Sequence, residues 1–173
     1  MAANQDKVTQ EVERRSSECL DGCIARIRHC LSQVSPAQVW WRPNDQMNSI
    51  ANLVLHLTGN VRRWVVSGIG GAQDIRHRPT EFTARGPILP EQLLTDLLAV
   101  VDDAKTTLLG ASTENLLQHR RVQGWTVNGF EALFDCIPHF KGHAQEIICL
   151  TRMQLGQAYR FYWEPATAEQ GAG

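Results

Sequence analysis

The sequence FDCIPHFKGHAQEIICLTRMQL, which spans residues 134–155, decides the fold of this chain. His139 and His143 stand four positions apart, and residues four apart on an α-helix lie on one face, one turn from each other. Two imidazoles in that relation can bind one metal ion from a single helix. Apolar residues flank the pair at Leu133, Ile137, Phe140, Ile147, Ile148 and Leu150. The stretch therefore predicts one long, mostly buried helix that presents a pair of histidines.

The whole chain has the size and charge of one globular domain. We expect residues 1–173 to form a single domain, with a flexible polar N-terminus and a flexible tail after about residue 164. The net charge of −1 provides no basic surface for nucleic acid. No apolar run reaches the roughly 18 residues of a membrane-spanning helix, and the N-terminus lacks the apolar centre of a signal peptide. The chain is therefore predicted to be cytoplasmic, with no nucleic-acid or membrane partner and with its five cysteines reduced.

Apolar periodicity predicts four long helices. Their ranges are 5–34, 48 or 49–67, 90–109, and 126 or 128–156. Asn48 or Ser49 is expected to cap the second helix, and Asn128 with Glu131 has the spacing of a capping box at the fourth. The core side of the first helix is predicted to carry Val8, Val12, Cys19, Cys23, Ile27 and Cys30. The predicted fold is an all-α four-helix bundle with long connections between helices 2 and 3 and between helices 3 and 4.

The connections carry residues that suggest either a ligand or packing. Trp40 and Trp41 follow the first helix, where they either grip a ligand or, as their large apolar area favours, seal the end of the bundle. Arg76 and Arg78 lie in the connection 70–90, where they either hold an anionic group of a substrate or remain solvated charges. These two arginines are the candidate substrate-binding residues. Within residues 111–127, the sequence before the fourth helix predicts a short extended turn.

A third histidine completes the candidate metal site. His56 lies beside the apolar stripe of the second helix, and facing helices of a bundle build metal sites in their interior. Imidazoles from His56, His139 and His143 leave positions open for water or substrate, as in a catalytic site. Glu146 follows His143 by three residues and is the candidate catalytic group, as a fourth ligand, an orienting residue or a general base. The other histidines lack a matching partner and are interpreted as structural or exposed: His29, His77 and His119.

Three stretches match the pattern of one family. They are NSIANLVLHL at residues 48–57, His139-x-x-x-His143 followed by Ile147, and Arg-x-Arg-x-x-Glu-Phe at residues 76–82. In these features, and over about residues 8 to 163, the chain resembles the DinB-like (damage-inducible) superfamily of four-helix bundles. The resemblance implies that His56, His139 and His143 bind a divalent transition metal, with zinc or nickel expected and iron or manganese as alternatives. It also implies a homodimer and a low-molecular-weight thiol as cosubstrate.

One departure from the family pattern leaves the reaction open. After the second histidine of helix four the commoner form reads His-x-Gly-Gln-Ile, whereas this chain places a carboxylate, Glu146, where that form has the amide. The first hypothesis is a metal-dependent S-transferase or isomerase that acts on small electrophiles, with a metal-dependent hydrolase as an alternative. The second is a non-catalytic dimeric bundle that binds metal. For the transferase, the resemblance implies a metal-bound thiolate, with Glu146 accepting its proton or fixing an imidazole, and no need for a protein cysteine.

Overall fold

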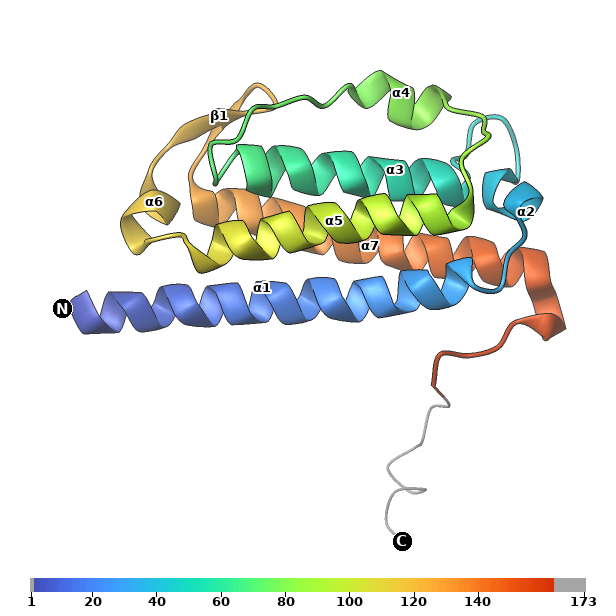
Figure 1. Cartoon of the computed structure of the whole chain (residues 1–173), viewed down its shortest axis with the longest axis horizontal. Helices are drawn as coiled ribbons and strands as arrows, with labels where there is room; N and C mark the ends of the chain where they lie inside the picture. The colour runs from blue at the N-terminus through green and yellow to red at the C-terminus, as the bar shows by residue number, and fades with distance from the viewer. Residues whose placement is uncertain (1, 164–173) are drawn as a thin grey trace, which may run out of the picture.

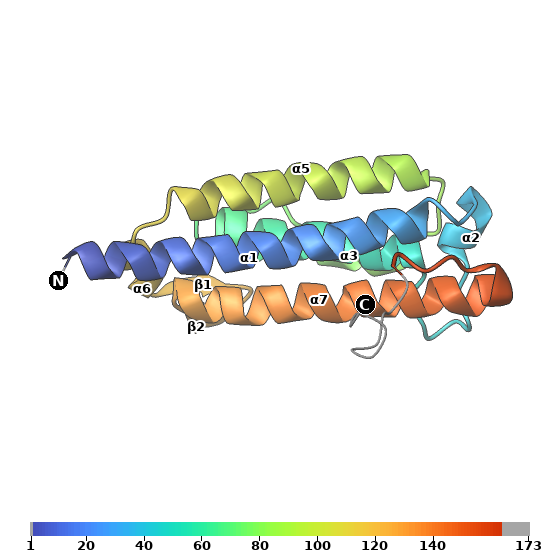
Figure 2. The ribbon, with the colours of Figure 1, turned by 90° about the horizontal axis from the view of Figure 1, so that it is seen from below.

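Four long helices form the body of the molecule. The computed structural model describes the backbone of residues 2–163 and the side chains of residues 7–163, so the tail predicted to be flexible lies outside the described residues. The long helices are α1 (Ala2–Leu31), α3 (Ile50–Val61), α5 (Pro90–Leu109) and α7 (Gly129–Leu155), and they run side by side (Figures 1 and 2). The prediction of an all-α four-helix bundle is confirmed.

Local hydrogen bonds determine where the two helices that carry the histidines begin. At α3, the Asn52 amide donates to the Ser49 side chain, and the Ser49 amide donates to the Asn52 side chain. Asn128 and Glu131 form the same reciprocal pair at the start of α7. Each pair satisfies two amide groups that the first turn of a helix leaves without partners. Of the two predicted caps for the second helix, Asn48 or Ser49, the structure has Ser49, and the predicted cap at Asn128 is confirmed.

The first helix differs from its prediction at both ends. α1 begins at Ala2, a few residues before its predicted start at about residue 5. It ends at Leu31, earlier than predicted, because Ser35 takes an extended conformation and caps the short helix α2 (Pro36–Trp40). Val8 is 53% exposed, which corrects its predicted place in the core. The first turns of α1 project beyond the other helices and have no partner helix to cover them (Figure 1).

A continuous apolar core lies between the four long helices. α1 packs against α7 and α5, and α3 packs against α5 and α7. Each long helix contributes fully buried side chains, among them Ile27, Leu57, Leu97 and Phe140. Burial of apolar area is the main stabilising term in folding. The fold therefore rests on this core and not on any single polar residue beside it.

The two long connections carry short elements that pack over the helices. In the first, α4 (Arg78–Thr83) lies across α3, whose last turns continue as the π-helical segment η1 (Arg62–Ser67). The second holds α6 (Thr113–Leu117) and an antiparallel hairpin of two strands, β1 (Arg120–Val122) and β2 (Trp125–Val127). The predicted short extended turn is this hairpin.

The two tryptophans after α1 have different environments. Trp40 is half-buried, and its indole Nε1 donates to the carbonyl of Ile88 at 3.1 Å. It therefore closes the end of the bundle as predicted. Trp41 is 39% exposed, which corrects its predicted place in the same seal.

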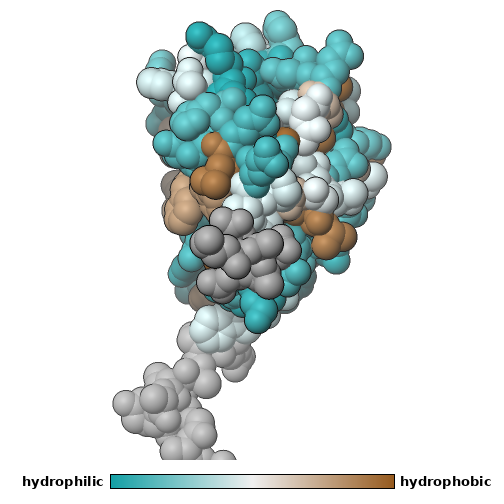
Figure 3. Space-filling model, turned by 90° about the vertical axis from the view of Figure 1, so that its left-hand side faces the viewer, coloured by the Kyte–Doolittle hydropathy of each residue, from teal (hydrophilic) through white to brown (hydrophobic). Residues whose placement is uncertain are grey.

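The surface is mainly hydrophilic at the end of the bundle where α6 and the hairpin lie. Figure 3 shows hydrophobic side chains there in separate places rather than as one patch. Scattered apolar side chains are usual on a protein surface. Within residues 2–163, no helix is both long enough and apolar enough to span a membrane.

Candidate metal centre

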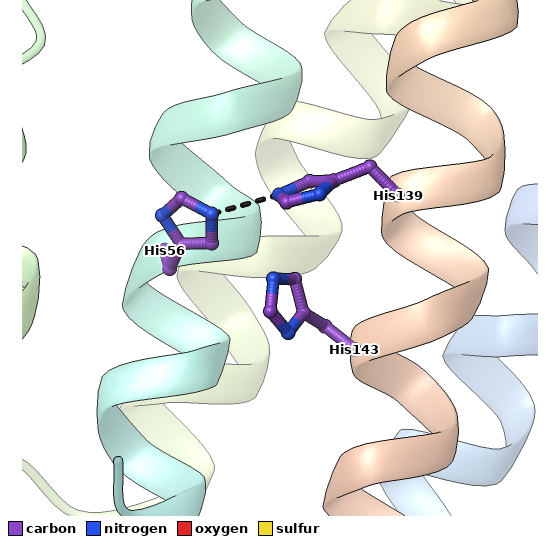
Figure 4. Close-up of side chains that lie close together, drawn as sticks. All are labelled: His56, His139 and His143. Atoms are coloured by element: carbon purple, nitrogen blue, oxygen red, sulfur yellow. Dashed lines mark hydrogen bonds between the residues drawn. The ribbon is translucent and has the colours of Figure 1, made fainter. Parts of the chain in front are cut away.

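Three histidines converge between α3 and α7. His56 projects from α3, while His139 and His143 project from successive turns of α7 (Figure 4). One ring nitrogen from each residue lies within 4.8 Å of the other two. The ring centroids are 5.0 Å apart for His56 and His139, 5.1 Å for His56 and His143, and 4.4 Å for His139 and His143. The structure therefore brings together the three histidines that the sequence singled out.

Carboxylates fix the orientation of two of these rings. Nδ1 of His56 donates to Oε2 of Glu81 at 2.8 Å, and Nδ1 of His143 donates to Oε2 of Glu146 at 2.8 Å. A carboxylate accepts, so each ring carries its proton on Nδ1, and its Nε2 has the lone pair of an acceptor. This is the arrangement that supports metal-ligating histidines in proteins. The donor set therefore fits a divalent transition metal ion.

His139 is the third histidine of the cluster, and its surroundings disfavour the protonated form of its ring. Burial, together with the nearby His143, His56, Arg76 and Arg78, lowers the pKa of His139 to about 4. The ring is therefore neutral near pH 7, as a metal ligand must be. Its Nε2 lies 2.8 Å from Nε2 of His56 and donates to it, because the proton of His56 is on Nδ1. A divalent ion would take the place of the proton in this hydrogen bond.

Glu81 is a site residue that the sequence analysis missed. Its side chain is only 8% exposed, and it lies on α4, in the long connection over α3. Burial raises the pKa of this carboxyl, but the hydrogen bonds from Arg76 and His56 outweigh burial and lower it overall. Glu81 is therefore an anion beside His56 at neutral pH. The segment Arg-x-Arg-x-x-Glu-Phe contained the signal for this residue. In it Arg76 and Glu81, which have opposite charges, stand five positions apart, and an aromatic residue follows.

Arg76 pairs with a carboxylate of the protein itself and neither faces solvent nor is free to hold a substrate anion. Its side chain is 1% exposed, with Nε 2.6 Å from Oε1 and Nη2 2.8 Å from Oε2 of Glu81. Its Nη1 donates to Oε1 of Gln123 in the hairpin at 3.2 Å. A buried carboxylate needs a counter-charge, and the fork of a guanidinium supplies one with two hydrogen bonds. Arg76 thus supports Glu81, which in turn orients His56.

Arg78 and Glu146 lie nearer to solvent at the same site. The guanidinium carbon of Arg78 lies 5.0 Å from the centre of the Phe82 ring, and that ring lies 4.9 Å from the ring of His56. Exposed and beside the histidines, Arg78 remains the candidate for an anionic substrate group. Of the three roles considered for Glu146, its bond to His143 is that of an orienting residue.

The thiols of two buried cysteines are poor nucleophiles. Burial raises the pKa of Cys23 to about 11 and the pKa of Cys136 to about 12. The Cys136 thiol donates to Oδ1 of Asn60 at 3.3 Å within the core. Only the thiolate attacks an electrophile or binds a metal readily. Neither residue is therefore a candidate nucleophile, and Cys149 is the cysteine that the structure exposes.

Gly59 gives the Glu81–Arg76 pair room to reach His56. A Cβ atom at Gly59 would lie 2.1 Å from Oε1 of Glu81 and 3.0 Å from Nε of Arg76. We expect Gly59→Ala to displace the carboxylate, to lower the free energy of unfolding by about 1–3 kcal/mol and to weaken metal binding. Urea unfolding and metal titration measure the two effects.

Gly142→Ala is the matched control, because no atom lies within 4 Å of a Cβ at Gly142 in α7. An alanine there is expected to change stability by less than about 1 kcal/mol, in the stabilising direction. Equal behaviour of the two variants would show that the close packing at Gly59 has no role.

Comparison with known proteins agrees with this description. Residues 9–165 match a family model described as protein of unknown function, DUF1572. A conserved protein of Enterococcus faecalis is similar in structure, with a TM-score of 0.70 and 20% identity over 83% of this chain and 96% of that chain. The DinB-like protein YjoA of Bacillus subtilis has a TM-score of 0.64 and 13% identity over 87% of this chain and 99% of that one. None of the curated proteins matches the chain. The predicted DinB-like fold is confirmed.

Proposed function

The chain belongs to the DUF1572 family, and from this membership, the DinB-like fold and the three converging histidines we propose that it is a divalent-metal-dependent enzyme. His56, His139 and His143 hold the ion, and a small molecule is the substrate. The observation that carries the proposal is the convergence of one ring nitrogen from each histidine within 4.8 Å, with a carboxylate on Nδ1 of His56 and of His143 that leaves each Nε2 as an acceptor. We propose zinc or nickel, with iron or manganese as alternatives, since all accept neutral imidazole.

The proposed reaction is the transfer of a small thiol to an electrophile, or a thiol-dependent isomerisation. When bound, the ion acts as a Lewis acid that lowers the pKa of a thiol or water molecule. Three protein ligands leave the position that such a molecule requires. Glu81 and Arg76 hold the His56 ring in place. We assign Glu146 to orient His143 and to accept the thiol proton, and Arg78 to attract the anionic end of the cosubstrate.

Turnover of an electrophile with and without thiol tests this reaction. The assay uses 1-chloro-2,4-dinitrobenzene with cysteine, glutathione or coenzyme A, before and after removal of metal with a chelator. We expect thiol-dependent turnover that His56→Ala abolishes and that Cys149→Ser leaves unchanged. Metal-dependent hydrolysis of 4-nitrophenyl acetate without any thiol would support a hydrolase instead. Turnover that survives loss of metal, or that requires Cys149, contradicts the proposal.

We further propose that the protein is a cytoplasmic homodimer. The family resemblance supports the dimer, as do two exposed tryptophans, Trp41 and Trp125, since tryptophan is enriched at subunit contacts. Light scattering at micromolar concentration is expected to give twice the mass of the chain. A monomer mass under these conditions would contradict the dimer.

A further inference from the structure

A cavity lies on a different face of α7 from His143. Its volume is about 320 Å³, within the range of small-ligand sites. Two arginines and four aromatic residues dominate its walls: Arg26, Arg152, Tyr159, Phe161, Tyr162 and Trp163. We call it the aromatic pocket. Gln145 and Ile148 of α7 also line it, two and five positions after His143. At 100° per residue, those positions point well away from the histidine cluster.

The segment that forms the outer wall is held in place by α1. After α7 the chain turns through η2 (Gly156–Ala158) and folds back along α1 and α7 (Figure 2). Nε2 of His29 donates to the carbonyl of Arg160 at 2.6 Å. Gln33 donates to the same carbonyl at 3.2 Å and accepts from the Arg160 amide at 2.8 Å. Three hydrogen bonds to one residue make this wall part of the folded structure.

The aromatic side chains on this wall are exposed despite its fixed backbone. Phe161, Tyr162 and Trp163 are 57%, 53% and 59% exposed. Both tyrosines of the chain lie in this segment, and Tyr159 packs edge-on against Phe161 with ring centres 5.3 Å apart. Large aromatic side chains gain little from such exposure when nothing covers them. Their clustering around a cavity is typical of a surface that receives a planar ligand.

The charge of the pocket is positive. The guanidinium of Arg152 lies 5.9 Å from the centre of the Tyr159 ring and 5.3 Å from that of Phe161. These cation–π contacts position Arg152 without neutralising it. Arg26 faces the pocket from α1, and among residues 7–163 neither arginine forms an ion pair. Among the lining residues that the structure describes there is no carboxylate.

From these features we propose that the aromatic pocket binds a small aromatic anion. Arg26 and Arg152 hold its carboxylate or phosphate, because a guanidinium pairs with either group through two hydrogen bonds. Its ring packs against Phe161, Tyr162 and Trp163. A cavity of about 320 Å³ admits one or two fused rings. This site is separate from the metal centre and does not depend on the function proposed for that centre.

Calorimetric titration of the full chain with three naphthalene probes tests the proposal. The probes are 1-naphthoate, 1-naphthyl phosphate and the neutral 1-naphthalenemethanol. We expect both anions to bind more tightly than the alcohol, and the tighter anion identifies the preferred group. Arg26→Gln and Arg152→Gln are each expected to raise Kd for the anions by about tenfold or more, as loss of a charged hydrogen bond does. In ¹⁵N NMR spectra, addition of either anion until the pocket is fully occupied is expected to shift the indole N–H signal of Trp163.

Two matched variants separate this site from others. Arg121→Gln removes an exposed arginine of the hairpin, and His143→Ala disrupts the proposed metal centre; both are expected to leave Kd unchanged. Circular dichroism checks that each variant is folded. Because Arg26 and Arg152 lie on different helices, the test can be made with either arginine variant if the other does not fold. Equal affinity for the alcohol and the anions overturns the proposal. So does an unshifted Trp163 signal, or a loss of binding in His143→Ala alone.

Discussion

Replacing His143 by alanine is expected to remove the bound metal and to leave the bundle folded. His143 supplies one of three imidazoles, and substitutions that only disturb the support of a metal ligand already reduce affinity by about 10–100-fold. Loss of the ligand itself should therefore exceed about 100-fold. The side chain is 22% exposed and lies beside the apolar core, so its removal opens no large cavity. Elemental analysis after gel filtration is expected to give about one ion per chain for the parent and little for the variant.

His119→Ala is the control for this experiment. His119 is exposed and lies before the hairpin, outside the cluster, so its replacement should leave the metal content unchanged. Thermal unfolding followed by circular dichroism checks that both variants retain the helical fold. If the His143 variant carries as much metal as the parent, the three-histidine site is wrong.

Replacing Arg76 by methionine is expected to have the largest effect on stability. The substitution keeps an unbranched apolar stem but removes the guanidinium, which leaves the carboxylate of Glu81 buried beside His56 without its counter-ion. Breaking a buried ion pair from one side costs about 3–5 kcal/mol, because the remaining charge is uncompensated. We expect a loss of this size in the free energy of unfolding, measured in urea. Metal affinity should fall as well, by about 10–100-fold, because Glu81 no longer holds the His56 ring.

Two further variants serve as controls for Arg76→Met. Arg63→Met breaks an ion pair that is more exposed than the Arg76–Glu81 pair, in which Nε of Arg63 lies 3.1 Å from Oδ2 of Asp74. This substitution should lower the free energy of unfolding by less than about 1 kcal/mol. Arg76→Met combined with Glu81→Gln removes both charges and should recover much of the lost stability, as coupled neighbours do in a double-mutant cycle. A cost for Arg76→Met no greater than that for Arg63→Met would contradict the role assigned to the buried pair.

Features that depend on neighbouring residues were predictable from the sequence. The caps at Ser49 and Asn128 need only the side chain three positions later, and both formed as predicted. The alignment of His139 with His143 follows from the period of the α-helix. The four long helices follow from apolar periodicity, because each helix must bury one face. The pairing of these histidines with His56 needed a bundle in which α3 faces α7, which the family resemblance implied.

The support of His56 in the candidate metal centre was decided by the tertiary structure alone. Glu81 reaches His56 across 25 positions of sequence, and Arg76 reaches Gln123 across 47. Such contacts depend on the path of a long connection, which no local period encodes. Arg76 was therefore predicted either to hold a substrate anion or to stay solvated, and Glu81 was overlooked. The same reason explains the wrong prediction for Val8. Its place in a helix was correct, but its burial required a partner helix, and no other helix in the described part of the chain extends along the first turns of α1. Local hydrogen bonds and periodicity thus determined the helices and the histidine pair, while the packing of distant segments determined which charges are buried and what they hold.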